Sequence, residues 1–243
     1  MVTFPCTRLK DSTVHQFPAL KLDRCEVIPH VALASSLCPR GNGTRNAELT
    51  LCHAGSLTLE RRGEGFLRLL RAMAKLFCQG NPRNRIRLRL AGIIDSSISQ
   101  YVMDLGLTAQ VEFLGKASYL DSLRYLSESD VQVVIESPYL GTLLQAKFVD
   151  YTQTRRPILA ISPRNGTLND ILSKHGGGIA TDCESDESVY QALSTLYDSW
   201  EQNRLQEMYG SERLYDLFDP ERIVTQYASL YERISTQRES AQK

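Results

Sequence analysis

Two stretches of the sequence hold residue types that suit a phosphate group and a pentose. In the first, Gly55 and Ser56 form a small-residue turn that is followed by the adjacent Arg61 and Arg62. Exposed backbone N–H groups, the positive end of a helix and guanidinium groups all attract phosphate. We therefore predict a phosphate or diphosphate site here. The alternative is a tight strand-to-helix turn with two solvated arginines.

The second stretch is a predicted helix in which Lys147, Asp150 and Tyr151 are spaced i, i+3 and i+4. Residues at this spacing share one face of a helix. A carboxylate on that face can accept hydrogen bonds from both hydroxyls of a ribose, while the ammonium group faces phosphate. The alternative is a surface ion pair that contributes about 0.3 kcal/mol.

The glycine pattern disfavours a nicotinamide dehydrogenase. The pair Gly63 and Gly65 begins eight residues after Gly55, and no third glycine follows it in register. A dinucleotide fingerprint needs its glycines directly after the strand, where the backbone approaches the pyrophosphate.

From residue 48 onward, strand patterns alternate with helix patterns. This alternation predicts βαβ units, hence a doubly wound parallel α/β sheet of the Rossmann type with helices on both faces. Such sheets bind ligands beyond the carboxyl ends of their strands. We expect strands at 48–53, 86–91, 110–114, 130–135, 157–161 and 178–181, and helices at 66–77, 96–105, 118–127, 143–154, up to 175, 186–200 and 220–238.

Residues 1–47 do not follow this rhythm, and we expect them to form an arm that leads into a domain of residues 48–243. The arm holds a possible strand at 2–4, a polar segment at 10–17, a strand-like segment at 26–28 and a Ser, Pro, Gly and Asn-rich linker at 35–46. Linkers of this composition connect domains.

Composition narrows the partners. Lys and Arg number 28, and so do Asp and Glu, so a neutral chain offers no overall field for nucleic acid or an anionic bilayer. The longest apolar run, Val131 to Ile135, is too short for a transmembrane segment. The six cysteines are scattered along the sequence, which argues against a metal site. No secretory signal is visible, so we expect a cytoplasmic location.

In the order of its motifs, the chain resembles the carboxyl-terminal, nucleotide-sugar-binding domain of GT-B glycosyltransferases of the group 1, family 4 kind. The resemblance covers residues 26–236. Four stretches carry it: Val27-Ile28-Pro29-His30, Leu51 to Ser56 with Arg61-Arg62, Val111-Glu112-Phe113-Leu114-Gly115, and Lys147 to Tyr151 followed by Arg156-Pro157-Ile158-Leu159-Ala160.

The resemblance implies a retaining transfer of a sugar from a nucleotide diphosphate to an unknown acceptor, with no cofactor or metal. The implied donor site divides into a diphosphate part, a ribose part and a base part. Its residues are Gly55, Ser56, Arg61, Arg62 and Lys147 for the diphosphate, Asp150 with Tyr151 for the ribose, and Gly115 with Lys116 for the base.

Two departures from the family pattern matter. The acidic residue that relatives place eight positions before the ribose-binding one is Thr142 here, and Glu136 is the nearest candidate for a catalytic acid. The alternative for Glu136 is a solvated carboxylate at a strand terminus.

The second departure is the missing acceptor-binding domain, of which the arm would be a remnant. We therefore expect a fragment, a donor half that needs a partner chain, or a protein that no longer turns over. The alternative function is a non-catalytic nucleotide-binding or scaffolding module.

Overall fold

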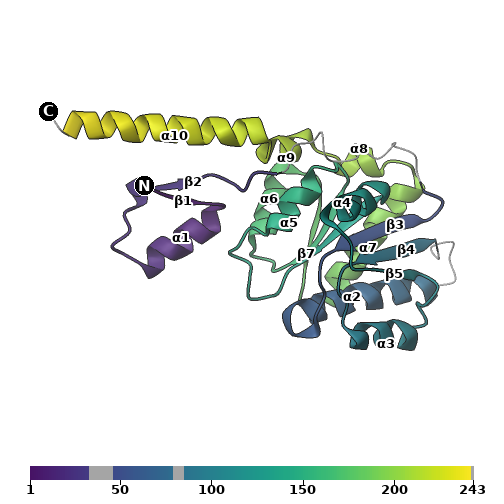
Figure 1. Cartoon of the computed structure of the whole chain (residues 1–243). Helices are drawn as coiled ribbons and strands as arrows, with labels where there is room; N and C mark the ends of the chain where they lie inside the picture. Colours follow the sequence, from purple (N-terminus) through teal and green to yellow (C-terminus); the bar gives the residue numbers. More distant parts are fainter. Residues whose placement is uncertain (33–45, 79–84, 242–243) are drawn as a thin grey trace.

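Six parallel strands form the central sheet of the protein (Figure 1). The computed structural model describes residues 1–32, 46–78 and 85–241, and for residues 59–62, 78 and 237–241 it describes the backbone alone. The strand order is β5-β4-β3-β6-β7-β8, so the predicted doubly wound parallel sheet is confirmed. The strands are β3 (Leu49–Ala54), β4 (Ile86–Ala91), β5 (Val111–Gly115), β6 (Val131–Ile135), β7 (Ile158–Ser162) and β8 (Gly178–Asp182).

Helices cover both faces of this sheet and enclose two apolar cores. On one face lie α2 (Leu59–Cys78), α3 (Ser96–Asp104) and α7 (Asp186–Glu201), and on the other α4 (Tyr119–Glu128), α5 (Ala146–Thr152) and α6 (Thr167–His175). Successive strand residues alternate between the two cores: Val133 and Ile135 belong to the first and Val134 to the second. Strands buried on both faces in this way read as continuous apolar runs, as the sequence of β6 does.

The first 32 residues form a small unit of their own. It consists of β1 (Val2–Phe4), α1 (Thr7–Gln16), the 3-10 helix η1 (Leu22–Arg24) and β2 (Cys25–Val27), and β1 pairs with β2 in parallel. The arm is therefore a βαβ unit, and our prediction that it lacks the strand–helix rhythm is wrong. The predicted linker at 35–46 lies outside the described residues, apart from Asn46.

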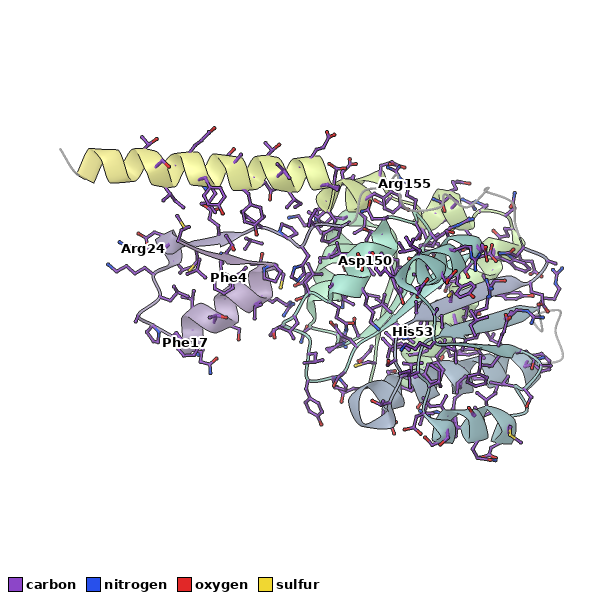
Figure 2. All side chains as sticks on the ribbon, viewed as in Figure 1. Phe4, Phe17, Arg24, His53, Asp150 and Arg155 are labelled. Carbon is purple, nitrogen blue, oxygen red and sulfur yellow. The ribbon has the colours of Figure 1, made fainter. Side chains whose placement is uncertain are left out.

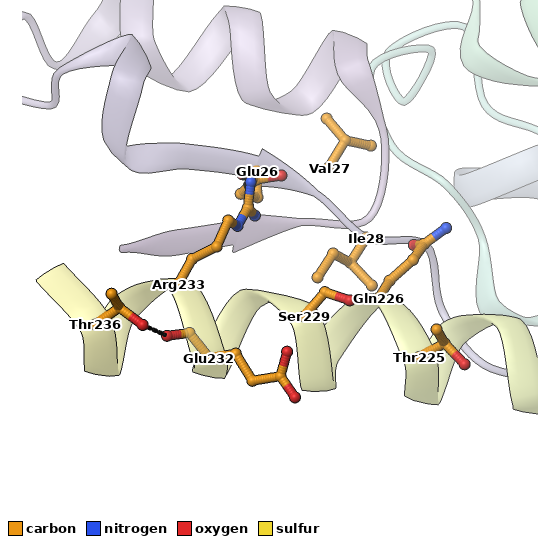
Figure 3. Close-up of a pocket in the computed structure, with 9 residues that line it drawn as sticks. All are labelled: Glu26, Val27, Ile28, Thr225, Gln226, Ser229, Glu232, Arg233 and Thr236. Carbon is orange, nitrogen blue, oxygen red and sulfur yellow. Dashed lines mark hydrogen bonds and ion pairs between the residues drawn. The ribbon is translucent and has the colours of Figure 1, made fainter.

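The last helix, α10 (Pro220–Ala241), runs beside the arm (Figure 1). Ile28, which follows β2, packs against Ile223 and Leu230 of α10. Arg233 also forms an ion pair with Glu26 at 2.6 Å. A groove of about 710 Å³ lies between β2 and α10 (Figure 3). Two short helices that we did not predict, α8 (Leu205–Tyr209) and α9 (Glu212–Leu217), connect α7 to α10.

The arm also contacts the sheet domain directly. The Cys6 thiol donates to the carbonyl oxygen of Thr142 at 3.2 Å, and the backbone N–H of Ala32 donates to the carbonyl of Phe218. In the part of the chain that the structure describes, no helix has both the length and the apolar character of a membrane span.

Candidate functional site

The switch point of the sheet lies between β3 and β6. From β3 the chain winds toward β5, and from β6 it winds the other way toward β8. The helices associated with these two strands lie on opposite faces, α2 against the first core and α5 against the second. Open α/β sheets bind ligands in the crevice at such a point, beyond the carboxyl ends of the strands. The candidate site is therefore the crevice at the ends of β3 and β6.

β3 and β6 separate before they end. Their ladder stops at the pair Cys52 and Gln132. One residue further on, the Nδ1 atom of the fully buried His53 lies 2.9 Å from the carbonyl oxygen of Val133. The His53 side chain thus takes the place of the backbone hydrogen bond that the next pair of the ladder would make. The strands diverge here, and the carbonyl of Val133 still has a hydrogen-bond partner.

Tyr151 ties α5 to the end of β3. Its hydroxyl lies 2.7 Å from both the backbone N and the carbonyl oxygen of Ala54, accepting from the first and donating to the second. The side chain is 2% exposed. We predicted Tyr151 as a ligand-binding residue, but the structure commits its hydroxyl to Ala54. These two hydrogen bonds join α5 to the last residue of β3.

Glycines form the rim of the crevice where β3, β4 and β5 end. The Gly55 N–H donates to the carbonyl of Ala91, and the Gly92 N–H donates to that of Gly115, both at 2.8 Å. All three glycines have positive φ, which is strained for other residues. A Cβ atom on Gly92 would lie 2.5 Å from the Gly55 oxygen. The two turns therefore run against each other with no space for a side chain.

Lys147 of α5 lies beside the Gly55 turn. Its Nζ atom is 3.2 Å from the position that a Cβ atom on Gly55 would occupy, and the His53 Nε2 atom is 3.7 Å from the same position. Ser56, the next residue, is exposed. The structure thus brings a cation from the second predicted stretch to the glycine turn of the first.

The two arginines lie within a helix rather than before it. We expected both residues in the loop before a helix that starts at residue 66. Because α2 begins at Leu59, Arg61 and Arg62 instead lie in its first turn. Their side chains lie outside the described residues. The backbone N–H groups of this first turn carry the partial positive charge of the helix.

Asp150 occupies the same helix as Lys147 and is half-buried (labelled in Figure 2). Burial raises the pKa of its carboxyl group, and a hydrogen bond from Tyr119 opposes that rise. Tyr119 begins α4, three residues after Lys116. The bond therefore connects the predicted ribose-binding residue with the segment after β5, where Gly115 and the exposed Lys116 were predicted to hold the base.

Glu136 directly follows β6. It is 1% exposed, so the alternative of a solvated carboxylate is wrong. The preceding residue, Ile135, faces α2, since a Cβ atom on Gly65 would lie 3.3 Å from its Cγ2 atom. Glu136 itself lies one residue beyond the strand, where its backbone N–H donates to the carbonyl of Ile161 at 2.9 Å. Ser162, which ends the neighbouring β7, is equally buried at 1% exposure.

Two residues of this crevice escaped the sequence analysis. His53 read as one more position of a buried strand, and Tyr119 read as part of a helix. Each takes its role from a partner in another segment, Val133 for the first and Asp150 for the second. No local pattern marks such partners. Among the described residues, no three His, Cys, Asp or Glu side chains gather as metal ligands.

No protein-family model matches the sequence, and no curated protein sequence matches it. Solved structures do match the fold. Sucrose-phosphate synthase from Thermosynechococcus elongatus aligns with a TM-score of 0.71 at 18% identity, over 97% of this chain and 58% of that one. HepE from Anabaena, solved in complex with UDP and glucose, aligns with a TM-score of 0.70 at 15% identity, over 96% of this chain and 62% of that one.

The carboxyl-terminal domain of LpcC, a group 1 glycosyl transferase from Francisella tularensis, decides the assignment. It aligns over 98% of its own length and 81% of this chain, with a TM-score of 0.58 at 13% identity. The chain has the fold of the carboxyl-terminal half of a GT-B glycosyltransferase. The chain spans 58% and 62% of the lengths of the synthase and HepE. Because those alignments cover 97% and 96% of the chain, the arm and α10 belong to the shared fold.

Proposed function

We propose that the crevice between β3 and β6 binds the nucleoside diphosphate of a sugar donor, and that the chain is the donor half of a glycosyltransferase. The observation that carries this proposal is the position of the Lys147 ammonium, beside the Gly55 turn at the switch point of the sheet. A cation, a glycine turn and a helix N-terminus at one sheet edge form the arrangement that binds phosphate groups.

The positive groups also suit the chemistry of transfer. When the bond from the sugar to the diphosphate breaks, negative charge gathers on the leaving diphosphate. Cations aimed at that charge stabilise the transition state more than the ground state. Lys147 would act in this way, together with Arg61 and Arg62 from the first turn of α2. These groups can carry the charge without a metal ion.

Asp150 would hold the ribose, and the backbone at Gly115 and Lys116 would hold the base. In support, Asp150 stands one helical turn from Lys147, and its partner Tyr119 follows Lys116 closely in the chain. Since HepE structures contain UDP and UDP-glucose, UDP is the first nucleotide to test.

For the transferred sugar we propose Glu136 as the acidic group, with retention at the anomeric carbon. In support, this carboxylate is buried and directly follows β6, one of the two strands whose ends form the crevice. Thr142, which takes the place of the acid of relatives, is exposed. The exchange of an acidic residue for Thr142 favours a second candidate function for the chain, a nucleotide-binding module without transferase activity.

An acceptor-binding domain, in the same polypeptide or in a partner chain, would complete the enzyme. Apolar side chains exposed on the arm and on α10 support this: Val2, Phe17, Leu22, Val224 and Tyr231 are between 40% and 66% exposed. Apolar side chains left exposed in this number can form part of a contact surface. We also propose the cytoplasm as the compartment, in keeping with the free thiols of Cys6, Cys25, Cys52 and Cys183.

Isothermal titration with UDP, ADP and GDP tests the donor site. We expect at least one of these nucleotides to bind the wild-type protein. The Arg62→Ala and Asp150→Ala variants should bind that nucleotide at least about tenfold more weakly, because each variant loses a charged contact. Equal and weak binding by all three proteins would reject the site. Incubation with labelled UDP-glucose then separates the two candidates, since slow hydrolysis or transfer is expected only from an enzyme.

A further inference from the structure

We propose that a cavity between the arm and the sheet domain binds an alkyl phosphate, with the alkyl chain along α6 and the phosphate beside Lys174. The cavity has a volume of about 280 Å³, and its walls come from the arm, from α6, and from residues near the ends of α9 and α10. Figure 1 shows α6 on the side of the sheet domain that faces the arm. None of the residues assigned to the donor site lines this cavity, so the inference does not depend on that site.

One face of α6 forms the floor of the cavity along the whole helix. The lining residues of α6 fall at i, i+3, i+4, i+7 and i+8, the spacing of a single helical face. They are Thr167, Asp170, Ile171, Lys174 and His175. Because a helix rises about 1.5 Å per residue, this floor is about 12 Å long. A cavity of this elongated shape suits a linear chain.

The wall that faces α6 is mostly apolar. Its apolar members are Pro5, Val27, Pro29, Leu144, Leu217 and Phe218. On the floor, Arg8 binds both carboxylate oxygens of Asp170, with Nη2 and Oδ1 2.9 Å apart, so these two opposite charges neutralise each other. An alkyl chain against this wall leaves water, and the loss of apolar surface from water favours binding.

Positive charge gathers where α6 ends. Partial burial lowers the pKa of the His175 imidazole. The charges of Lys174, Arg213 and Arg222 lower this pKa further, so all three cations lie close enough to act on the ring. None of the three forms an ion pair within the part of the chain that the structure describes.

These cations select the head group of the ligand. The end of a helix contributes a partial negative charge of about half a unit, which opposes an anion but is smaller than three full positive charges. A phosphate monoester carries a charge of about −1.5 to −2 at pH 7, and lysine binds phosphate as a point charge. A phosphate at this end of the cavity therefore compensates cations that the protein leaves without a carboxylate.

Gln226 of α10 adds an independent observation. This residue lines the cavity, and its Oε1 atom is buried without a hydrogen-bond partner among the described residues. A buried polar atom without a partner is expected where a ligand or a bound water completes the hydrogen bonding. The walls of the cavity thus contain a polar group that the protein itself does not satisfy.

A water-filled gap between the arm and the sheet domain is the competing explanation. In that case the cavity has no preference for any solute. The two explanations differ in a measurable way, because only a binding site requires the alkyl chain and the phosphate to be joined in one molecule.

Isothermal titration with n-octyl phosphate, n-octanol and inorganic phosphate separates the two explanations. The concentrations stay below the critical micelle concentration of octyl phosphate. We expect octyl phosphate to bind, and each of the other two probes to bind at least about tenfold more weakly, because each lacks one half of the ligand. Absence of octyl phosphate binding, or equal affinity for all three probes, would overturn the proposal.

A lysine variant then tests the position of the phosphate. Lys174→Met keeps an apolar stem but loses the charge, and we expect it to weaken octyl phosphate binding about tenfold, the effect of losing one charged contact. Lys21→Met is the matched control, since Lys21 is also exposed but lies on the arm outside the cavity lining. Equal affinity of the two variants would contradict the position beside Lys174.

Methyl NMR of isoleucine-labelled protein locates the alkyl chain without any variant. The methyl resonances of Ile171 should shift when octyl phosphate is added, and those of Ile98, which is buried in the other core, should stay in place. A saturating concentration of UDP should not reverse the shift of Ile171. An unshifted Ile171, or displacement of octyl phosphate by UDP, would overturn the proposal. If the protein binds no nucleotide, the donor site fails, and the titrations with octyl phosphate still decide this one.

Discussion

The hydroxyl of Tyr151 on α5 lies 2.7 Å from both the backbone nitrogen and the backbone oxygen of Ala54, the last residue of β3. This contact spans the point where the two halves of the sheet wind apart, and it is buried. The helix that carries Lys147 and Asp150 is thereby joined to the strand that leads into the Gly55 turn. The geometry of the candidate site depends on that joint.

Tyr151→Phe removes the hydroxyl and leaves two buried backbone groups of Ala54 without this partner. We expect the free energy of unfolding to fall by about 1 to 3 kcal/mol, the cost of an unsatisfied buried polar group. Urea denaturation measures it. Tyr139→Phe is the control, because Tyr139 is 92% exposed and should lose almost nothing. Equal stability of the two variants would show that the Ala54 contact carries no weight.

Gly92→Ala places a Cβ atom 2.5 Å from the Gly55 oxygen, at a φ of +139°. Since that oxygen belongs to the backbone, it cannot move aside as a flexible side chain can. We expect a loss of more than about 3 kcal/mol in the free energy of unfolding, typical of severe overpacking. Thermal and urea denaturation measure the loss.

Gly106→Ala is the matched control for this substitution. Gly106 also has positive φ, +68°, but a Cβ atom there would meet nothing within 4 Å. Backbone strain alone should then cost about 1 to 2 kcal/mol. If Gly106→Ala proved as damaging as Gly92→Ala, the close approach of the two turns would not be the cause.

Asp150→Asn tests the raised pKa of Asp150. A carboxyl group whose pKa is raised by folding favours the folded state when protonated, and that contribution is lost as the pH rises through the folded-state pKa. The carboxylate therefore costs stability at neutral pH, and the neutral amide should recover up to about 1 kcal/mol, since solvent screens this half-buried group. The gain should shrink as the pH falls toward about 4, the ordinary pKa of aspartate.

Melting temperatures of the wild type and Asp150→Asn across this pH range provide the measurement. Asp186→Asn is the control of opposite sign, because a hydrogen bond from Arg71 lowers the pKa of Asp186. That variant should be less stable than the wild type at neutral pH, and the difference should vanish as the pH falls below the ordinary aspartate pKa. A stability loss by Asp150→Asn at pH 7 would contradict the raised pKa.

We expect Asp150→Asn also to bind UDP more weakly than the wild type, so that stability and binding change in opposite directions.

The sheet could be predicted because its strands carry their own signals. The strand predicted at 86–91 agrees with β4 to the residue, since its apolar positions alternate and a glycine ends it. The arm helix α1 was missed for the opposite reason: none of its residues is buried, so the sequence contains no apolar stripe. For α5, the predicted start at 143 was three residues too early, because Leu143 closes a turn onto Leu140 and the helix begins only at Ala146.

The candidate site was predicted in part. Gly55, Lys147 and Asp150 were predicted because residues of these types bind phosphate and ribose at recognisable spacings, and the structure places Lys147 beside the Gly55 turn. The part played by His53 could not be found, because it depends on the divergence of β3 from β6 and on a carbonyl 80 positions away. The hydrogen bonds between the Tyr151 hydroxyl and the backbone of Ala54 could not be predicted either, because Ala54 belongs to another segment of the chain. A helical spacing shows which residues share a face, but not which of them a neighbouring strand occupies.

The most direct test of the donor crevice is an NMR titration of glycine-labelled protein with UDP. The chain has 15 glycines, and several of them lie at opposite ends of the sheet. If the crevice binds the nucleotide, the ¹⁵N amide resonances of Gly55 and Gly115 should shift on titration. Those of Gly176 and Gly177, which precede β8 at the far end of the sheet, should stay in place. Shifts confined to Gly176 and Gly177, or no shift of Gly55 at saturating UDP, would contradict the account.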